Sequence, residues 1–306
     1  MSRRIAAIDF GTNTARLLIA DLAIDGRFSQ VALKRKVVRL GGGFSRQYGL
    51  AEDAMARAAE CFQEFSDIID QHAVATIRAV ATSAVRDAAN GPAFVEQISR
   101  ETGIKLEVID GATEGRLTLA GVLAGLDEQP QELLMFDVGG GSTEYTLARG
   151  CRPCFVQSLP LGVVRLTEGK ADSAEMADKI GRELDGLEQR LAELELAVDS
   201  RALLVGTAGT ATTLAALSLG MATYDYRKVN NHVLDLHEIQ RLYDLLSPLT
   251  PEERLLHAGL EKGREDLIIA GSLITIMTLQ RFGFTQMKVS DYGLLEGLVV
   301  AGDALQ

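Results

Sequence analysis

Two similar stretches, Asp9-Phe-Gly-Thr-Asn-Thr14 and Asp137-Val-Gly-Gly-Gly-Ser-Thr-Glu144, decide the fold expected for this chain. Each lies between two apolar runs, which predicts a strand, a tight turn and a second strand. The acid ends the first strand, the glycines let backbone N–H groups approach an anion, and the hydroxyls can donate to phosphate oxygens. Because the loop occurs twice, we expect a polyanion clamped between two facing hairpins rather than ordinary glycine-rich turns.

Both loops differ from the common nucleotide motifs. A Walker A loop ends in Gly-Lys-Ser/Thr and opens a helix, and the dinucleotide fingerprint also runs from strand to helix. The residues expected to contact phosphate are Gly11, Thr12, Asn13 and Thr14 in the first loop and Gly139, Gly140, Gly141, Ser142 and Thr143 in the second.

Composition limits the classes of protein to consider. A chain of 306 residues is expected to form two domains. Its net charge of −11 argues against a broad nucleic-acid surface. The apolar run Leu267–Leu279 is shorter than the ~20 residues that span a bilayer, so a buried helix is expected there and no membrane segment. Because the N-terminus enters a strand at once, without a cleavable apolar segment, we expect a cytoplasmic protein.

Cysteine and histidine residues indicate no metal or redox centre. Cys61, Cys151 and Cys154 cannot form a disulfide framework, and the Cys151-Arg-Pro-Cys154 stretch is expected in a hairpin turn. The four histidines lack metal-ligand spacing. The cluster Lys34–Arg39 is a candidate for gripping an anion or, equally, a charged strand edge.

Helix and strand patterns alternate in both halves, which predicts a duplicated α/β fold. The polar stretch Gly125–Glu132 marks the boundary, so the expected domains are residues 1–126 and 127–306, with return of the last helix to the first domain as an alternative. The expected helices cover residues 51–70, 88–102, 114–123, 173–198 and 264–281, with others starting near Gly206, Thr250 and Gly293, and the expected strands cover 4–40 in part, 77–81, 105–109, 202–205 and 287–290.

Several motifs in order resemble the exopolyphosphatase / guanosine pentaphosphate phosphatase (Ppx/GppA) family, essentially from end to end. The motifs are Asp9 to Leu17, Ala81 to Asn90, Gly111 to Arg116, Asp137 to Glu144, Gly206 to Thr210 and Asp291 to Gly297. This resemblance implies two actin-like (ribonuclease H-like) domains facing a central cleft, each supplying one phosphate loop. This chain ends at Gln306 and is expected to be a short form of two domains.

The resemblance also implies roles for individual residues. Glu114 matches the catalytic glutamate, which would orient and deprotonate the attacking water. Asp9, Asp137 and Glu144 would lie near Mg²⁺, another divalent cation or K⁺, with Asp137 and Glu144 counted among the catalytic acids. Arg86 matches a basic residue that faces phosphate. The loop that corresponds to the nucleotide side of the superfamily contains Gly206, Thr207, Gly209 and Thr210.

Two departures from the family pattern stand out. Leu295 occupies a position where the family usually has arginine, and Thr12 and Thr14 replace serines while keeping the hydroxyls. The resemblance leaves a homodimer open.

Four functions are considered on this basis. The leading one is a Mg²⁺-dependent phosphohydrolase that removes terminal phosphate from inorganic polyphosphate, an exopolyphosphatase. Guanosine pentaphosphate (pppGpp) is an alternative substrate of the same reaction class. A sugar-kinase-like phosphotransferase and a nucleotide-gated actin- or chaperone-type protein are the alternatives from other classes.

Overall fold

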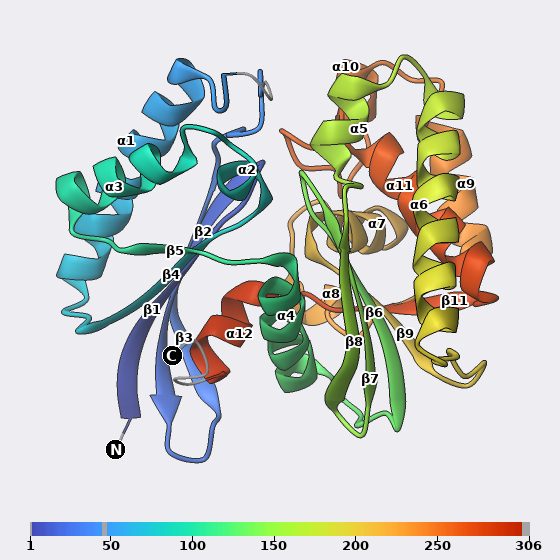
Figure 1. Cartoon of the computed structure of the whole chain (residues 1–306), viewed down its shortest axis with the longest axis horizontal. Coiled ribbons are helices and arrows are strands. Elements are labelled where there is room, and N and C mark those ends of the chain that lie inside the picture. Colours follow the sequence, from blue (N-terminus) through green and yellow to red (C-terminus); the bar gives the residue numbers. More distant parts are fainter. Residues whose placement is uncertain (1, 45–47, 302–306) are drawn as a thin grey trace. The chain divides into compact units, whose positions relative to one another are not determined.

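The computed structural model describes residues 2–44 and 48–301, and its contacts divide the chain into two compact units (Figure 1). The first unit contains the residues up to Ala124 together with those from Gly293 onward, and the second runs from Gly125 to Tyr292. The chain therefore leaves the first unit after Ala124 and returns to it at Gly293.

The first unit is built on a mixed five-stranded sheet with the order β3-β2-β1-β4-β5. β1 pairs antiparallel with β2 and parallel with β4, β2 pairs antiparallel with β3, and β5 extends the parallel part. The strands are β1 (Ser2–Phe10), β2 (Thr14–Ala23), β3 (Phe28–Val37), β4 (Thr76–Ala81) and β5 (Leu106–Val108). The helices are α1 (Glu52–Gln71), α2 (Ser83–Arg86), α3 (Gly91–Thr102), α4 (Gly111–Gly125) and α12 (Leu294–Val300).

Both faces of this sheet are covered, because successive residues of a strand point to opposite sides. On one face Phe10 packs edge-on against Phe62 of α1, with ring centroids 4.9 Å apart. On the other face Ala7 belongs to a cluster with Leu298 of α12. Arg78 of β4 donates to the carbonyl oxygen of Leu298 at 2.7 Å, which satisfies the C-terminal end of that helix.

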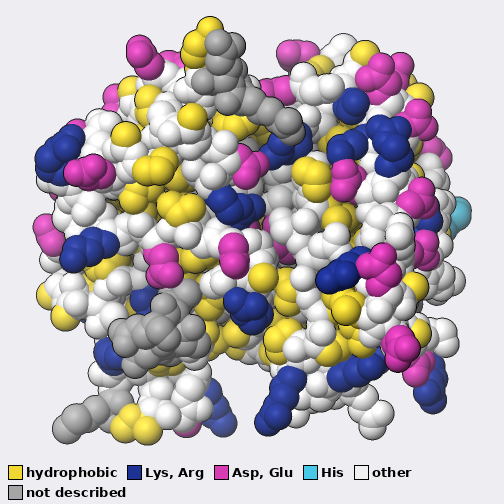
Figure 2. Space-filling view, viewed as in Figure 1, with side chains coloured by type: hydrophobic (Ala, Val, Ile, Leu, Met, Phe, Trp, Pro, Cys, Tyr) yellow, Lys and Arg dark blue, Asp and Glu magenta, His cyan; other side chains and the backbone are white. Residues whose placement is uncertain are grey.

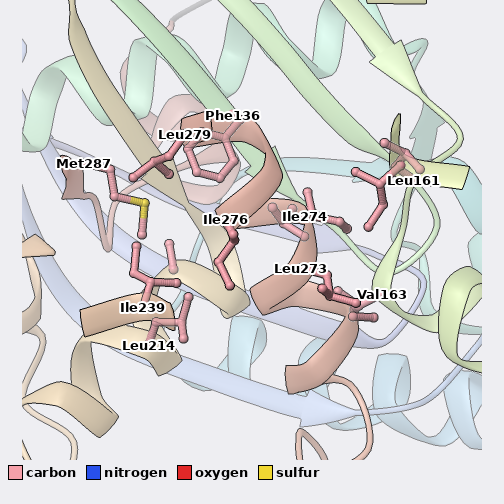
Figure 3. Packing of buried hydrophobic residues seen from close by; sticks show 14 of the residues in the cluster. Phe136, Leu161, Val163, Leu214, Ile239, Leu273, Ile274, Ile276, Leu279 and Met287 are labelled. Atoms are coloured by element: carbon pink, nitrogen blue, oxygen red, sulfur yellow. The ribbon is translucent and has the colours of Figure 1, made fainter. Parts of the chain in front are cut away.

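The second unit is built on a six-stranded sheet with the order β10-β11-β9-β6-β7-β8. Its strands are β6 (Glu132–Val138), β7 (Thr143–Arg149), β8 (Arg152–Leu159), β9 (Leu203–Thr207), β10 (Val233–Asp235) and β11 (Gln286–Val289). Its helices are α5 (Val163–Gly169), α6 (Ser173–Glu193), α7 (Ala208–Ser218), α8 (Tyr226–Val229), α9 (Leu236–Leu246), α10 (Pro251–Arg254) and α11 (Ile268–Phe282). Figure 3 shows the core of this unit, where Ile276 of α11 lies on the side of Met287, Ile239 and Leu214, and Leu273 of the same helix lies near Val163.

The two sheets repeat one plan. β3-β2-β1-β4 in the first unit corresponds to β8-β7-β6-β9 in the second, with the same order and the same strand directions. The duplicated α/β fold predicted from the sequence is confirmed. The glycine-containing loops at residues 9–14 and 137–144 connect β1 to β2 and β6 to β7, so they occupy equivalent places in the two units.

Most predicted elements are present, with shifted ends. The helix expected over 88–102 begins at Gly91, and the one expected over 173–198 ends at Glu193 because Glu195 adopts a left-handed φ of 55°. Helix α9 and strand β10 were not predicted, although Asp235 caps α9 by accepting from the N–H of Glu238. The helix start predicted near Thr250 is confirmed, since Thr250 and Glu253 form a capping box at the start of α10.

One local prediction is confirmed in part and another in full. Gly150 and Cys151 form the β7–β8 turn with φ of 55° and 61°, the pattern of a type I′ turn, whereas Arg152, Pro153 and Cys154, which were also expected in the turn, lie in β8. The apolar run Leu267–Leu279 lies almost entirely in α11 and is mostly buried.

No helix within residues 2–44 and 48–301 is long and apolar enough to cross a bilayer. On the face drawn in Figure 2, acidic and basic side chains are interspersed.

Candidate active site

The first loop is a closed turn between β1 and β2 whose carbonyl groups are tied to the chain that follows β3. The N–H of Gly11 donates to the carbonyl oxygen of Thr14 at 3.0 Å. The Thr12 carbonyl accepts from Gly41, and the Asn13 carbonyl accepts from Arg39, both at 2.9 Å. In a trans peptide the N–H group points opposite to the C=O group of the residue before it. The N–H groups of Asn13 and Thr14 therefore point away from the segment after β3 that binds the loop carbonyls.

Asp9, at the end of β1, forms an ion pair inside its own hairpin. It lies opposite Arg16 of β2, whose Nε and Nη2 donate to Oδ2 of Asp9 at 3.1 and 2.7 Å. Asp9 is 9% exposed, so the pair lies largely out of solvent. The predicted role of Asp9 beside a cation stays a prediction, and the Arg16 contact shows that Oδ2 is engaged.

The Thr12 hydroxyl is buried and hydrogen-bonded to a second loop of the same unit. Its Oγ1 lies 3.0 Å from Oγ of Ser83, the first residue of α2, and both residues are buried. The N–H of Thr82 donates to the carbonyl of Phe10 at 3.2 Å, which joins the end of β4 to the end of β1. The segment after β4 therefore fixes the rotamer of Thr12.

Glu114 lies in the first turn of α4 and is only 8% exposed. Nη1 of Arg86 donates to Oε2 of Glu114 at 3.3 Å and to the carbonyl oxygen of Ile109 at 2.9 Å. The two residues that the sequence analysis placed in the site from separate motifs are thus in direct contact. Arg86 holds the carboxylate of Glu114, while its predicted contact with phosphate remains a prediction.

The helix that carries Glu114 begins with a side-chain cap. Asp110 accepts the N–H of Thr113 at 2.7 Å. The backbone N–H of Thr113, followed by its hydroxyl, lowers the pKa of Asp110 below its ordinary value of 3.8. Because a carboxylate at this end also suits the helix dipole, the cap fixes the first turn and the position of Glu114 within it.

The second loop, between β6 and β7, is held from one side by α5. The carbonyl oxygens of Gly139 and Gly140 accept from the N–H groups of Val163 and Val164 at 3.0 and 2.9 Å. The carbonyl of Gly141 accepts from Nε of Arg165 at 2.8 Å.

Three successive carbonyl groups of this loop therefore point toward α5. By peptide geometry the N–H groups of Gly140, Gly141 and Ser142 point to the opposite side. Consecutive N–H groups directed to one side form a concave anion site, or nest. The loop closes as the first one does, since Gly139 donates to the Ser142 carbonyl at 2.9 Å.

Two carboxylates flank the second loop. Asp137 and Glu144 are direct partners across the β6–β7 hairpin, so their side chains lie on one face of the sheet. Asp137 is 9% exposed and Glu144 is 1% exposed. Oγ of Ser158, on β8, donates to Oε1 of Glu144 at 2.6 Å. Burying two acids on one face is costly unless cations or donors compensate them.

This pair fits a hard divalent cation. Carboxylate oxygens are the donors that Mg²⁺ prefers, and Mg²⁺ is commonly bound by one or two carboxylates together with substrate phosphate oxygens. Within residues 2–44 and 48–301 there is no group of three or more His, Cys, Asp or Glu side chains that could enclose a metal ion. Asp137 and Glu144 could supply two carboxylate ligands to such a cation.

The predicted nucleotide-side loop connects β9 to α7 in the second unit. Thr207 is buried, and its hydroxyl donates to the carbonyl of Tyr292 at 3.0 Å. Ala208 adopts a left-handed φ of 62°. A Cβ at Gly209 would lie 1.7 Å from Nη1 of Arg264, so the guanidinium of Arg264 packs directly on the Gly209 backbone. Thr210 is buried where α7 begins.

Leu295 lies in the core of the first unit. It is 1% exposed and packs in the cluster that covers one face of β1 and β2. The adjacent Glu296 accepts the N–H of Gly293 at 2.8 Å, which caps α12. At this position the leucine therefore serves packing.

Several supporting residues were not picked out from the sequence. Each of them holds a predicted site residue by a hydrogen bond. They are Arg16, Ser83, Ser158 and Arg165. Arg16 and Ser83 lie inside motifs already recognised, so position within a motif was the available signal. Ser158 and Arg165 follow the second loop by more than ten residues, and only the pairing of β7 with β8 and the return of α5 bring them to it.

A scan against protein-family models finds the Ppx/GppA phosphatase family over residues 19–303. Exopolyphosphatase 2 of Mycobacterium tuberculosis is 32% identical, over 97% of this chain and 98% of the relative. A bifunctional 3-dehydroquinate synthase/phosphatase of Fusobacterium nucleatum is also 32% identical over 97% of this chain, which spans 46% of that longer protein.

Solved structures give the same result. The Aquifex aeolicus PPX-GPPA enzyme is 35% identical, with a TM-score of 0.81 over 98% of this chain and 100% of the other.

Proposed function

Because the chain belongs to the Ppx/GppA phosphatase family, we propose that it is a Mg²⁺-dependent exopolyphosphatase that removes the terminal phosphate from inorganic polyphosphate. Family membership makes it a phosphatase, a hydrolase of phosphoanhydride bonds, rather than a sugar-kinase-like phosphotransferase or a chaperone. The substrate and the metal are the proposed part.

The observation that carries the proposal is the nest of the second loop. Its three N–H groups, from Gly140, Gly141 and Ser142, are directed to one side by the hydrogen bonds of the loop carbonyls to α5. Such donors are fixed before the substrate arrives, so they stabilise charge on a phosphoryl group without reorganisation. They recognise phosphate oxygens and no base or sugar, which suits a substrate made of phosphate alone.

Glu114 is the proposed general base. Its carboxylate is buried and held by Arg86, and a positioned carboxylate can orient and deprotonate the water that attacks the terminal phosphorus. Phosphoryl transfer depends mainly on positioning and on neutralising charge on the equatorial oxygens. When bound, Mg²⁺ would supply part of that neutralisation, with Asp137 and Glu144 as the residues that hold it.

The test is phosphate release by the purified protein with Mg²⁺ from short polyphosphate, long polyphosphate, guanosine pentaphosphate and ATP. Glu114→Gln is assayed in parallel, and the exposed Glu107→Gln on β5 is the matched control, since it also converts a carboxylate to an amide. A general base contributes roughly 10²- to 10⁴-fold, so Glu114→Gln should lose at least about 100-fold in kcat while Glu107→Gln keeps wild-type turnover.

The substrate panel separates the remaining alternatives. A higher kcat/KM on polyphosphate than on guanosine pentaphosphate supports the proposal, and the reverse order assigns the chain to the nucleotide substrate. Full activity of Glu114→Gln would remove this residue from the mechanism. Release from none of the four substrates would overturn the proposed function.

A further inference from the structure

The most buried carboxylate of the second loop, Glu144, has a hydroxyl partner on the edge strand of its sheet. Glu144 lies directly opposite Ser158 in the β7–β8 pairing, and Oγ of Ser158 is 2.6 Å from Oε1 of Glu144. An ionised carboxylate only accepts, so the serine donates. The distance lies in the range of charge-assisted O–H···O⁻ bonds, about 2.5 to 2.7 Å.

We propose that Ser158 is a positioning residue for Glu144, an inference that rests on the proposed role of this acid in holding the cation and substrate. The terminal torsion of a glutamate has a broad, roughly two-fold preference, so burial alone does not select one orientation of its oxygens. The bond from Ser158 occupies Oε1 and thereby sets the direction of Oε2. Residues that hold a metal-binding carboxylate in this way typically change metal affinity or activity about 10- to 100-fold when removed.

The geometry of the sheet explains why this residue is suited to the task. Asp137, Glu144 and Ser158 lie on three adjacent strands in direct register, so their side chains share one face. The serine also provides a donor beside two neighbouring acids. It is a neutral donor, so it adds no positive charge that would compete with a cation.

The same strand offers a matched control. Cys154 is close to serine in size, and its Sγ donates to the backbone carbonyl of Leu147 at 3.3 Å, away from either carboxylate. Cys154→Ala therefore removes a polar group and a hydrogen bond from β8 without touching the site. If Ser158 served only the integrity of the strand, the two alanine variants would behave alike.

The experiment compares wild type, Ser158→Ala, Ser158→Thr and Cys154→Ala in two assays. Titration calorimetry measures the dissociation constant of Mg²⁺ for the substrate-free protein, with Mn²⁺ as a second probe. Steady-state kinetics on polyphosphate gives kcat and KM. Ser158→Ala should bind the cation or turn over at least about 10-fold less well. Ser158→Thr, which keeps the hydroxyl, should recover to within about threefold, and Cys154→Ala should match wild type.

The outcomes separate this inference from the proposed function. A folded Ser158→Ala variant with unchanged cation affinity and kcat overturns the inference and leaves the function intact. A wild type that releases no phosphate overturns the function. In that case weaker cation binding by Ser158→Ala, restored in Ser158→Thr, still supports the positioning role. Equal losses in Ser158→Ala and Cys154→Ala, or a loss that threonine does not restore, indicate a packing effect and overturn it.

Discussion

Gly162 is the N-cap residue of α5 and packs against the backbone of the second phosphate loop, so its replacement by alanine tests whether this loop sets the reaction rate. The backbone of Gly162 has φ of −109° and ψ of 149°, which alanine adopts without strain. The added Cβ would lie 2.1 Å from the carbonyl oxygen of Gly140 and 2.3 Å from the carbonyl carbon of Gly141. The three nearest atoms all belong to the loop backbone and none to a flexible side chain, so the loop and the start of α5 must shift relative to each other.

The size of the displacement follows from these distances. Cβ atoms essentially never approach other atoms closer than 3.0 Å, so a 2.1 Å contact requires a shift of about 0.9 Å. A misplacement of about 1 Å in a positioned reaction can cost roughly 100-fold in rate, or about 2.7 kcal/mol. We therefore expect kcat/KM on polyphosphate to fall about 100-fold in Gly162→Ala.

The assay is steady-state phosphate release, with thermal unfolding measured in parallel. Gly169→Ala, at the other end of α5, is the control because a Cβ there meets nothing within 4 Å. It should keep wild-type kcat/KM. A folded Gly162→Ala variant with kcat/KM within twofold of wild type would refute the assignment of this loop to phosphate binding.

Two further predictions concern the first unit. Arg86→Ala removes the donor to Oε2 of Glu114. Because a hydrogen bond to a charged group contributes about 1.5–3 kcal/mol, kcat should fall roughly 10- to 100-fold in steady-state assays. An unchanged kcat would show that Glu114 does not need the hydrogen bond from Arg86. Asp110 has a lowered pKa in the folded state, so its ionised form stabilises the protein above the ordinary value of 3.8, and this stabilisation is lost as the pH falls through the lower folded-state pKa. Asp110→Asn keeps the capping oxygen but cannot titrate. The difference between its melting temperature and that of the wild type should therefore shrink in scans from pH 6 down to pH 3. A difference that stays constant over that range would show that ionisation of Asp110 does not stabilise the fold.

Local chemistry made most of the secondary structure predictable. Helix α3 ends at Gly103, whose φ of 73° suits glycine, and α10 begins with the capping box of Thr250. Strand β10 has only three residues and one buried side chain, so it carries too little pattern to be recognised. Helix α9 has a capping aspartate, Asp235, and an apolar face, so its local signals were present although no helix was predicted there.

The sequence by itself determined the two hairpin loops, their duplication and the residue types at their tips, because glycines, hydroxyls and strand-ending acids act within a few residues of one another. Only the tertiary structure decided which side the loop N–H groups face, since that depends on α5 in one unit and on residues 38–41 in the other. It also decided the partners of the acids. Arg86 reaches Glu114, and Ser158 reaches Glu144, through strand order and helix placement. Such contacts join residues distant in sequence, and no local pattern records them.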